Sequence, residues 1–204
     1  MLNRYARALV TRILTPVAKL LLRLGIGPDL VTIVGTIGVV AAALWFFPRG
    51  DLFVGTMVIT LFVFSDTIDG VMARLSGRTS TWGAFLDSTL DRMGDAAIFA
   101  GLTIWYFEGG ADRLTAILAL LCLVLGMLVS YARARAEGVG LRADVGIAER
   151  GDRLVVTLVT AGFVGLGVFP PVVMTVVLAL LAVASVITVL QRILVVRRQA
   201  LAES

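Results

Sequence analysis

Four aspartates stand in a chain that is otherwise strongly apolar, and they are the residues best suited to chemistry. They are Asp66, Asp69, Asp87 and Asp91. An unpaired charge in the hydrocarbon core of a membrane is costly, so each carboxylate needs a positively charged partner. The chain contains no histidine, and its single cysteine, Cys122, stands in an apolar run. Carboxylate ligands without imidazole or thiolate favour Mg²⁺ or Mn²⁺. The composition therefore predicts a divalent metal site.

Two helical stripes account for the spacing of these aspartates, because residues three, four, seven and eight positions apart share one helical face. The first stripe consists of Asp66, Asp69, Gly70, Ala73 and Arg74. The second repeats every four residues and consists of Gly83, Asp87 and Asp91. Small residues beside the carboxylates would leave a groove for a phosphate-bearing ligand, with Arg74 at its mouth. The alternative is that the small residues serve close helix packing.

The rest of the chain predicts an all-α integral membrane protein. Of its 204 residues, 59% are hydrophobic and 16% charged, and the mean hydropathy is +0.98, well outside the range of soluble domains. We expect one domain over 1–204 with six transmembrane helices in the region 29–195. Their expected ranges are 29–47, 52–75, 81–107, 112–136, 153–169 and 171–195. Residues 2–24 have basic and apolar residues on opposite helical faces, which favours an amphipathic interfacial helix over a solvated basic tail.

The basic residues are distributed unevenly along this layout. Of the 18 lysines and arginines, only Arg49 and Arg113 fall in loops on the far side, which leaves 16 on the near side. Such a bias places both termini and the aspartates on the cytoplasmic side of the plasma membrane. The basic pI of about 10.0 is then explained by basic residues that meet anionic lipid headgroups. We expect no nucleic-acid partner.

The aspartate motif is similar, at every defined position and spacing, to the signature of the CDP-alcohol phosphotransferase family. The resemblance covers essentially the whole chain and implies a homodimeric enzyme of the bacterial cell membrane that displaces CMP from CDP-diacylglycerol with an alcohol. It implies two Mg²⁺ or Mn²⁺ ions, with Asp66, Asp69 and Asp87 as ligands. Asp91 would be both a ligand and the general base. General chemistry agrees, because attack on a diphosphate needs charge neutralisation and a chain without histidine must use a carboxylate base.

The same resemblance implies a set of contacts with the CDP-lipid. These residues are Pro28, Asp29, Leu30, Val31, Thr32, Gly70, Ala73, Arg74, Ser80 and Gly83. Asp29 departs from the family pattern, in which asparagine is common. Ser80 is also suited to capping the helix that follows it. Asp95 lies outside the signature, and we expect it to form a buried hydrogen bond or helix contact.

Arginines near the connection between the fourth and fifth spans could form an anion pocket beside the metals. They are Arg133, Arg135, Arg153 and Arg192. Such a pocket suits an acceptor that already carries a phosphate, although ordinary cytoplasmic charge is the alternative for any one of them. The segment 130–137 and the following 140–150 resemble actinobacterial family members that use 1D-myo-inositol 3-phosphate, although Arg133 replaces a lysine of some relatives. That resemblance implies a phosphatidylinositol phosphate product and CMP.

Three other functions differ in how well they fit the pattern. Glycerol 3-phosphate as acceptor needs the same metal site and a similar phosphate pocket. A cation transporter could use intramembrane aspartates, but the last two spans carry no polar path. A structural scaffold gives no reason for the four aspartates.

Overall fold

The protein is built from long helices, and the computed structural model describes residues 14–77 and 80–202, without the side chains of 65–67 and 76. A helical segment covers 14–23, so residues 2–13 of the predicted interfacial helix lie outside the described residues. The labelled elements are α2 (Pro28–Phe46), η1 (Phe47–Arg49), α3 (Leu52–Ser76), α4 (Thr81–Phe107), α5 (Arg113–Glu137), α6 (Arg150–Gly165) and α7 (Val172–Ala202). No strand occurs among the described residues. The all-α prediction is confirmed.

The last two helices differ most from the sequence prediction. The range 153–169 was wrong at both ends, since α6 begins at Arg150 and ends at Gly165. Gly167 has a φ of +71°, a conformation that favours glycine and stops the helix. The range 171–195 was too short, because α7 continues to Ala202. Its 31 residues span about 46 Å at 1.5 Å per residue, so α7 exceeds a hydrocarbon core of about 30 Å.

Four helical stretches of the described part are long and apolar enough to cross a membrane. They are Pro28–Arg49, Leu52–Leu75, Arg113–Glu137 and Val172–Ala202. Helix α4 carries several charges in its first half, and α6 is only 16 residues long. Both nevertheless pack against these four, α4 on α2 and α5, and α6 on α3 and α7. The protein is therefore a helical membrane protein.

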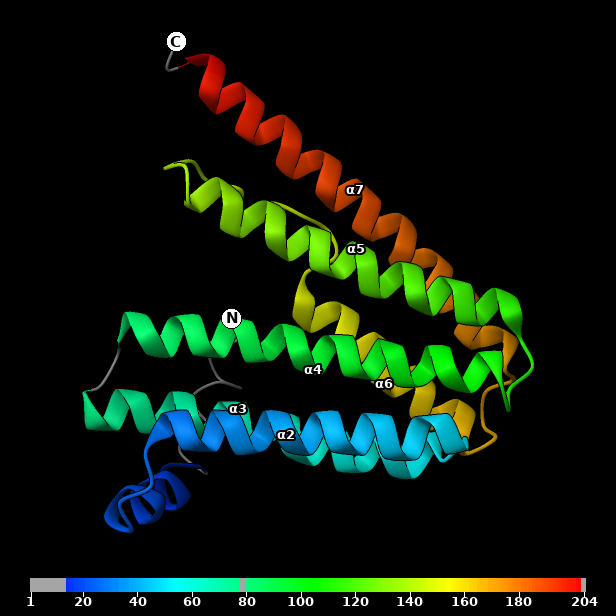
Figure 1. Ribbon diagram of the computed structural model, residues 1–204, viewed down its shortest axis with the longest axis horizontal. Coiled ribbons are helices and arrows are strands. Elements are labelled where there is room, and N and C mark those ends of the chain that lie inside the picture. The colour runs from blue at the N-terminus through cyan, green and yellow to red at the C-terminus, as the bar shows by residue number, and fades with distance from the viewer. Residues whose placement is uncertain (1–13, 78–79, 203–204) are drawn as a thin grey trace.

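The helices form one bundle that opens toward one end (Figure 1). Helices α2, α3 and α4 run together, whereas α5 and α7 pack on each other and diverge from α4 toward that end. Helix α6 begins partway along the bundle. The segment 14–23 and the end of α7 lie at the same end. Close packing at the other end requires glycine: a Cβ on Gly101 of α4 would lie 2.5 Å from the Ala43 carbonyl oxygen of α2. Close packing at this end holds the helices in place, and their polar residues lie toward the open end of the bundle.

Asp112 fastens the start of α5 to the start of α7. Its Oδ1 accepts a hydrogen bond from the Thr115 backbone N–H at 3.1 Å, and its Oδ2 accepts one from Thr115 Oγ1 at 2.6 Å. Thr115 Oγ1 also lies 2.6 Å from Thr175 Oγ1 of α7. The hydrogen bonds from the Thr115 hydroxyl and backbone N–H hold the pKa of Asp112 below its ordinary value. The ionised carboxylate is thus the form that stabilises the fold.

Replacement of Asp112 by alanine is expected to destabilise the protein by about 1–2 kcal/mol, the usual contribution of a helix cap. Because the pKa is lowered on folding, this contribution is complete above the ordinary aspartate pKa of about 4 and disappears as the pH falls through the folded value. Thermal unfolding in detergent should therefore show a difference between wild type and D112A at pH 7 that shrinks below about pH 4. An equal difference at both pH values would contradict this role.

Candidate functional site

A polar cavity of about 300 Å³ lies where α2, α3 and α4 meet at the open end of the bundle. It is lined by Pro28, Asp29, Thr32, Asp69, Gly70, Ala73, Ser80, Gly83, Ala84 and Asp87. Thus α3 and α4 each contribute one aspartate of the motif to the same space, as the two-stripe pattern predicts. Cavity-lining residues of α2 lie three and four positions apart, which places them on one helical face.

Asp69 is the buried carboxylate of this cavity, with 7% of its surface exposed. It accepts a hydrogen bond from Thr32 Oγ1 of α2 at 2.5 Å. Ser80 Oγ accepts a hydrogen bond from the Gly83 N–H at 2.9 Å, so the predicted cap of α4 is confirmed. A Cβ on Gly83 would lie 3.3 Å from Ser80 Oγ and 3.8 Å from Asp29 Oδ1. Glycine therefore keeps this wall of the cavity open.

Seven of the ten residues expected to contact a CDP-lipid line this cavity, and three do not. Leu30 is 52% exposed, and Val31 packs against the apolar cluster of Ala18, Val71 and Met72. Each residue of an α-helix is rotated by about 100° from the one before, so Leu30 and Val31 leave the face shared by Pro28, Asp29 and Thr32. Leu30 and Val31 therefore do not line this cavity, and their predicted contacts with a CDP-lipid stay predictions.

The remaining motif residues lie around the cavity. Arg74 is exposed, and its Nη1 would lie 3.6 Å from a Cβ on Gly70, so it stands beside the cavity without lining it. Asp66 is one helical turn before Asp69 and Gly70 on α3, but its side chain lies outside the described part of the structure. Among the described side chains, no group of three or more acidic residues is close enough to hold a metal.

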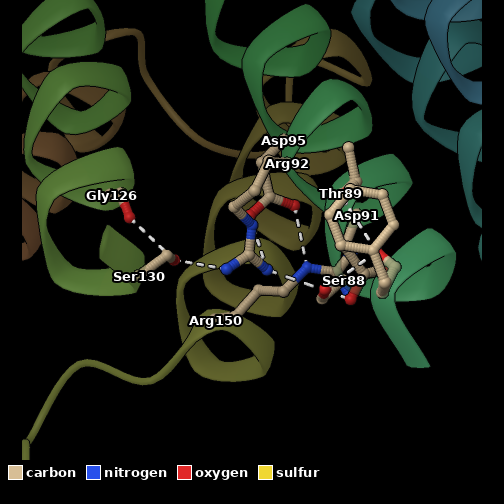
Figure 2. A network of polar contacts seen from close by, with 9 residues as sticks. Ser88, Thr89, Asp91, Arg92, Asp95, Gly126, Ser130 and Arg150 are labelled. Atoms are coloured by element: carbon tan, nitrogen blue, oxygen red, sulfur yellow. Dashed lines mark hydrogen bonds and ion pairs between the residues drawn. The ribbon is translucent and has the colours of Figure 1, made fainter. Parts of the chain in front are cut away.

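Asp91 is not among the residues that line this cavity, and it pairs with the start of α6 (Figure 2). Its Oδ2 lies 2.8 Å from Nη1 of Arg150, and Nε of the same arginine donates to Asp95 Oδ1 at 3.0 Å. Arg92 Nη2 lies 3.9 Å from Asp91 and 3.8 Å from Asp95. Asp95 is 8% exposed, which confirms the buried hydrogen bond predicted for it. The two carboxylates therefore share two arginines.

A second cavity of about 430 Å³ lies on the other side of this ion-pair network, between α4, α5, α6 and α7. It is lined by Ser88, Arg92, Val129, Ser130, Arg133, Ala134, Glu137, Glu149, Arg150, Gly151, Arg153 and Arg192. Five arginines against two glutamates make it strongly positive. The planar guanidinium with several donors suits phosphate oxygens. The arrangement can hold an anion.

Three of the four arginines predicted for an anion pocket line this cavity, namely Arg133, Arg153 and Arg192. Arg135 is exposed and is absent from the wall, so its predicted contact with an anion stays a prediction. It stands two positions after Arg133 on α5, so the two point to nearly opposite sides. Arg150 and Arg92 were missed as cavity residues. Arg92 follows Ser88 by one helical turn, a spacing that the sequence contains.

Two cavity arginines are fixed by the irregular segment 138–149, which connects α5 to α6. Arg192 donates from Nε to the Val145 carbonyl at 2.9 Å and from Nη1 to the Val129 carbonyl at 2.5 Å. Arg153 donates from Nη1 to the Ala148 carbonyl at 2.8 Å. They are 4% and 1% exposed respectively. A buried charge needs such hydrogen bonds, and these bonds also fix the direction of both guanidinium groups.

Thr188 of α7 also holds the segment 138–149. Its Oγ1 accepts hydrogen bonds from the backbone N–H groups of Ile147 at 3.2 Å and Ala148 at 3.1 Å. Gly146 passes over this threonine with a φ of +149°, and a Cβ there would lie 2.4 Å from Thr188 Cγ2. The segment is therefore tied to α7 and forms a fixed wall of the arginine-lined cavity.

A further cavity of about 470 Å³, between α3 and α6, is lined almost entirely by apolar side chains. Its polar side chains are the hydroxyls of Thr56 and Thr60. Without an ionisable group it offers no chemistry of its own. Among these three cavities, the ionisable side chains therefore lie at the two polar ones.

Comparison with known proteins identifies relatives that cover nearly the whole chain. A phosphatidylinositol phosphate synthase from Streptomyces avermitilis is 53% identical over 98% of this chain and 84% of that protein. One from Cutibacterium acnes is 49% identical over 94% of this chain and 96% of that protein. The crystal structure of the Mycobacterium tuberculosis phosphatidylinositol phosphate synthase with CDP-DAG bound superposes with a TM-score of 0.87 at 48% identity. That match covers 91% of this chain and 94% of the other.

A second crystal structure of the M. tuberculosis enzyme, in complex with manganese and citrate, superposes with a TM-score of 0.84 at 47% identity. It covers 90% of this chain and 88% of the other. A sequence model of the CDP-alcohol phosphatidyltransferase family matches residues 26–149, which include the aspartate motif. The resemblance seen in the spacing of the four aspartates is thereby confirmed. The chain belongs to the CDP-alcohol phosphatidyltransferase family.

Proposed function

We propose that the protein transfers the phosphatidyl group of CDP-diacylglycerol to a hydroxyl of 1D-myo-inositol 3-phosphate, releasing CMP. The observation that carries this proposal is the pair of polar cavities that meet at helix α4. One holds Asp69 and Asp87 and the other holds five arginines, while Asp91 contacts Arg150 between them. A two-substrate transfer needs one site for each substrate and a base where they meet. The names of the relatives support the choice of substrates.

The donors of the first cavity fit a divalent metal. Asp69 and Asp87 supply carboxylate oxygens to one space, and the chain contains no histidine. Hard oxygen donors suit Mg²⁺ or Mn²⁺, and the manganese in a relative supports the same choice. We infer that Asp66, Asp69, Asp87 and Asp91 would hold two ions. Bound there, divalent ions supply neutralisation of the negative charge on a diphosphate.

The protein's own residues bind the substrates and move one proton in this proposal. Gly70 and Gly83 leave room for the CDP diphosphate, and Arg74 contacts it from the exposed side. Asp91 accepts the proton of the attacking hydroxyl, whose oxygen forms a bond to the phosphorus that carries diacylglycerol. The bond from that phosphorus to the CMP oxygen breaks, and CMP leaves. Thr32 orients the buried Asp69 through its hydrogen bond.

We further propose that all six helices α2 to α7 cross the membrane, with both termini and both polar cavities on the cytoplasmic side. Both α4 and α6 pack against neighbouring helices of the bundle, and Asp87 and Arg92 of α4 and Arg150 and Arg153 of α6 line the two cavities. The positive-inside bias of the sequence supports the orientation. A homodimer in the bacterial cell membrane is also expected, as the family resemblance implies.

The proposal is tested by measuring CMP release from the purified protein with CDP-diacylglycerol and Mg²⁺. We expect release to require inositol phosphate, with free inositol unable to replace it, because the arginine-lined cavity is built for an anion. Equal rates with inositol and inositol phosphate would contradict a phosphate-bearing acceptor. Vesicles that take up a cation without any CMP release would support the transporter alternative.

Replacement of Arg133 by glutamine is expected to raise the KM for inositol phosphate about tenfold, the effect of losing one charge-assisted hydrogen bond. The KM for CDP-diacylglycerol should stay within twofold, because Arg133 lies outside the first cavity. Its side chain is half exposed, so the fold should tolerate glutamine. Arg135→Gln is the matched comparison and should leave both constants nearly unchanged, and initial-rate kinetics with each substrate varied measure all of them. A larger effect of R135Q than of R133Q would contradict the placement of the pocket.

A further inference from the structure

Arg150 is the residue that connects the arginine-lined cavity with Asp91 of the aspartate motif. It is the first residue of α6 and lines the arginine-rich cavity. Its guanidinium reaches out of that cavity to Asp91 Oδ2, with Nη1 at 2.8 Å, and to Asp95 Oδ1, with Nε at 3.0 Å. Figure 2 shows it lying across the gap between α6 and these two residues of α4. One side chain thus touches both the acceptor space and the proposed base.

The other arginines of the cavity are held by different groups. Arg153 and Arg192 donate to backbone carbonyls, and Arg133 pairs with Glu137 and Asp144. Arg92 donates to Ser130, and its nearest nitrogen lies 3.9 Å from Asp91. Among the cavity arginines, Arg150 therefore makes the shortest contact with Asp91. Its side chain is 28% exposed, so an entering anion can reach it.

The contact with Arg150 bears directly on what Asp91 can do. A charge-assisted hydrogen bond from a guanidinium holds the accepting oxygen toward that guanidinium, so the contact fixes Oδ2 of Asp91 on the side of α6. A phosphate in the cavity offers the same guanidinium several anionic oxygens and a bidentate geometry. The phosphate of the acceptor and the Asp91 carboxylate therefore compete for Arg150.

We propose that Arg150 makes the release of Asp91 depend on the acceptor, by exchanging Asp91 for the acceptor phosphate. The inference rests on the proposed function. It makes Arg150 a positioning residue that acts through Asp91. Its consequence is protection of the CDP-lipid from water whenever no acceptor is bound.

The reaction that Arg150 suppresses is hydrolysis. A water oxygen would form the bond to the phosphorus that carries diacylglycerol, and its proton would pass to Asp91. The bond from that phosphorus to the CMP oxygen would break, giving phosphatidic acid and CMP. Water is small enough to reach the phosphorus without filling the arginine-lined cavity. Hydrolysis by water and transfer to the acceptor therefore differ in whether that cavity is occupied, and Arg150 responds to this occupation.

The test compares hydrolysis with transfer in the purified protein, using labelled CDP-diacylglycerol, Mg²⁺ and separation of phosphatidic acid from the inositol phosphate lipid. In Arg150→Gln we expect phosphatidic acid formation without acceptor to rise about tenfold, the change expected when one charge-assisted hydrogen bond is lost. Transfer should fall, with a higher KM for inositol phosphate. Arg150→Lys keeps the charge and should give an intermediate ratio of hydrolysis to transfer. Arg198→Gln, an exposed arginine near the end of α7, is the control and should behave as wild type.

A second measurement uses the wild-type protein alone and does not depend on the folding of a variant. Sulfate carries charge for the cavity but no hydroxyl able to attack, so millimolar sulfate should raise phosphatidic acid formation several-fold in wild type and leave Arg150→Gln unaffected. An unchanged ratio of hydrolysis to transfer in Arg150→Gln, or no stimulation of wild type by sulfate, would overturn the inference. Transfer by wild type reports separately on the proposed function, so the two failures are distinguishable.

Discussion

Asp91→Asn is expected to lower the rate of transfer at least about 100-fold, because general-base catalysis typically contributes 10²–10⁴-fold. Asparagine has the shape of aspartate but can neither accept the proton nor neutralise a cation. The arginines at its position remain paired, since Arg150 and Arg92 also contact Asp95. The loss should therefore appear in kcat with little change in thermal stability. CMP release at saturating concentrations of both substrates measures it.

Asp51→Asn is the matched control for this variant. Asp51 is the residue just before the start of α3, at the end of that helix far from the aspartate motif. It is exposed and makes no side-chain hydrogen bond to the start of α3. It should retain wild-type activity. A general base contributes at least about 100-fold to the rate. If Asp91→Asn kept more than about a tenth of wild-type activity, its loss would be too small for a general base, and Asp91 would not be the base.

Removal of divalent ions is expected to reduce CMP release to the background level, because charge on the diphosphate would then be left without neutralisation. Treatment with EDTA followed by removal of the chelator should give inactive protein. Addition of Mg²⁺ or Mn²⁺ should restore activity, as the oxygen donors of Asp69 and Asp87 predict.

The position of the ions is tested by Asp69→Asn, which should raise the Mg²⁺ concentration needed for half-maximal activity about tenfold or more, since each carboxylate ligand sets part of a site's affinity. Asp112→Asn, far from both polar cavities, should leave that concentration unchanged. Full activity of wild type after complete chelation would contradict a metal-dependent reaction.

Helical periodicity predicted most of the fold and much of the site. The third helix was predicted at 81–107 and observed at Thr81–Phe107, because Ser80 is a strong cap and Glu108 begins a polar loop. Asp69, Gly70, Ala73, Gly83 and Asp87 meet at one cavity, as stripes on two neighbouring helices require. Spacing within a helix carries this information directly.

The same rule shows why some of the predicted site residues do not line either cavity. Leu30 and Val31 were included as part of the segment 28–32, and Arg135 for its place before the connection between α5 and α6. One or two positions along a helix turn a side chain away from its neighbour's face. The predicted end of α6 was wrong because a turn at Gly167 stops the helix earlier. The predicted end of α7 was wrong because that helix continues beyond the length needed to cross a bilayer. Hydropathy alone does not report either feature.

Arg150 was missed for a different reason. Its contacts with Asp91 and Asp95 join residues more than 50 positions apart, on α6 and α4, and no spacing within one helix encodes them. The segment 138–149 likewise gains its structure from Thr188 and Arg192 of α7. Tertiary packing created both features, so only the structure could place them.

The account is tested most directly by identifying the lipid product when the two acceptors compete. Purified protein is given labelled CDP-diacylglycerol, Mg²⁺ and equal concentrations of 1D-myo-inositol 3-phosphate and glycerol 3-phosphate, and the products are separated by chromatography and mass. We predict that phosphatidylinositol phosphate is the main product and that it forms in step with CMP. Phosphatidylglycerol phosphate as the main product would contradict the proposed acceptor, and labelled lipid that remains unchanged would contradict the transferase function itself.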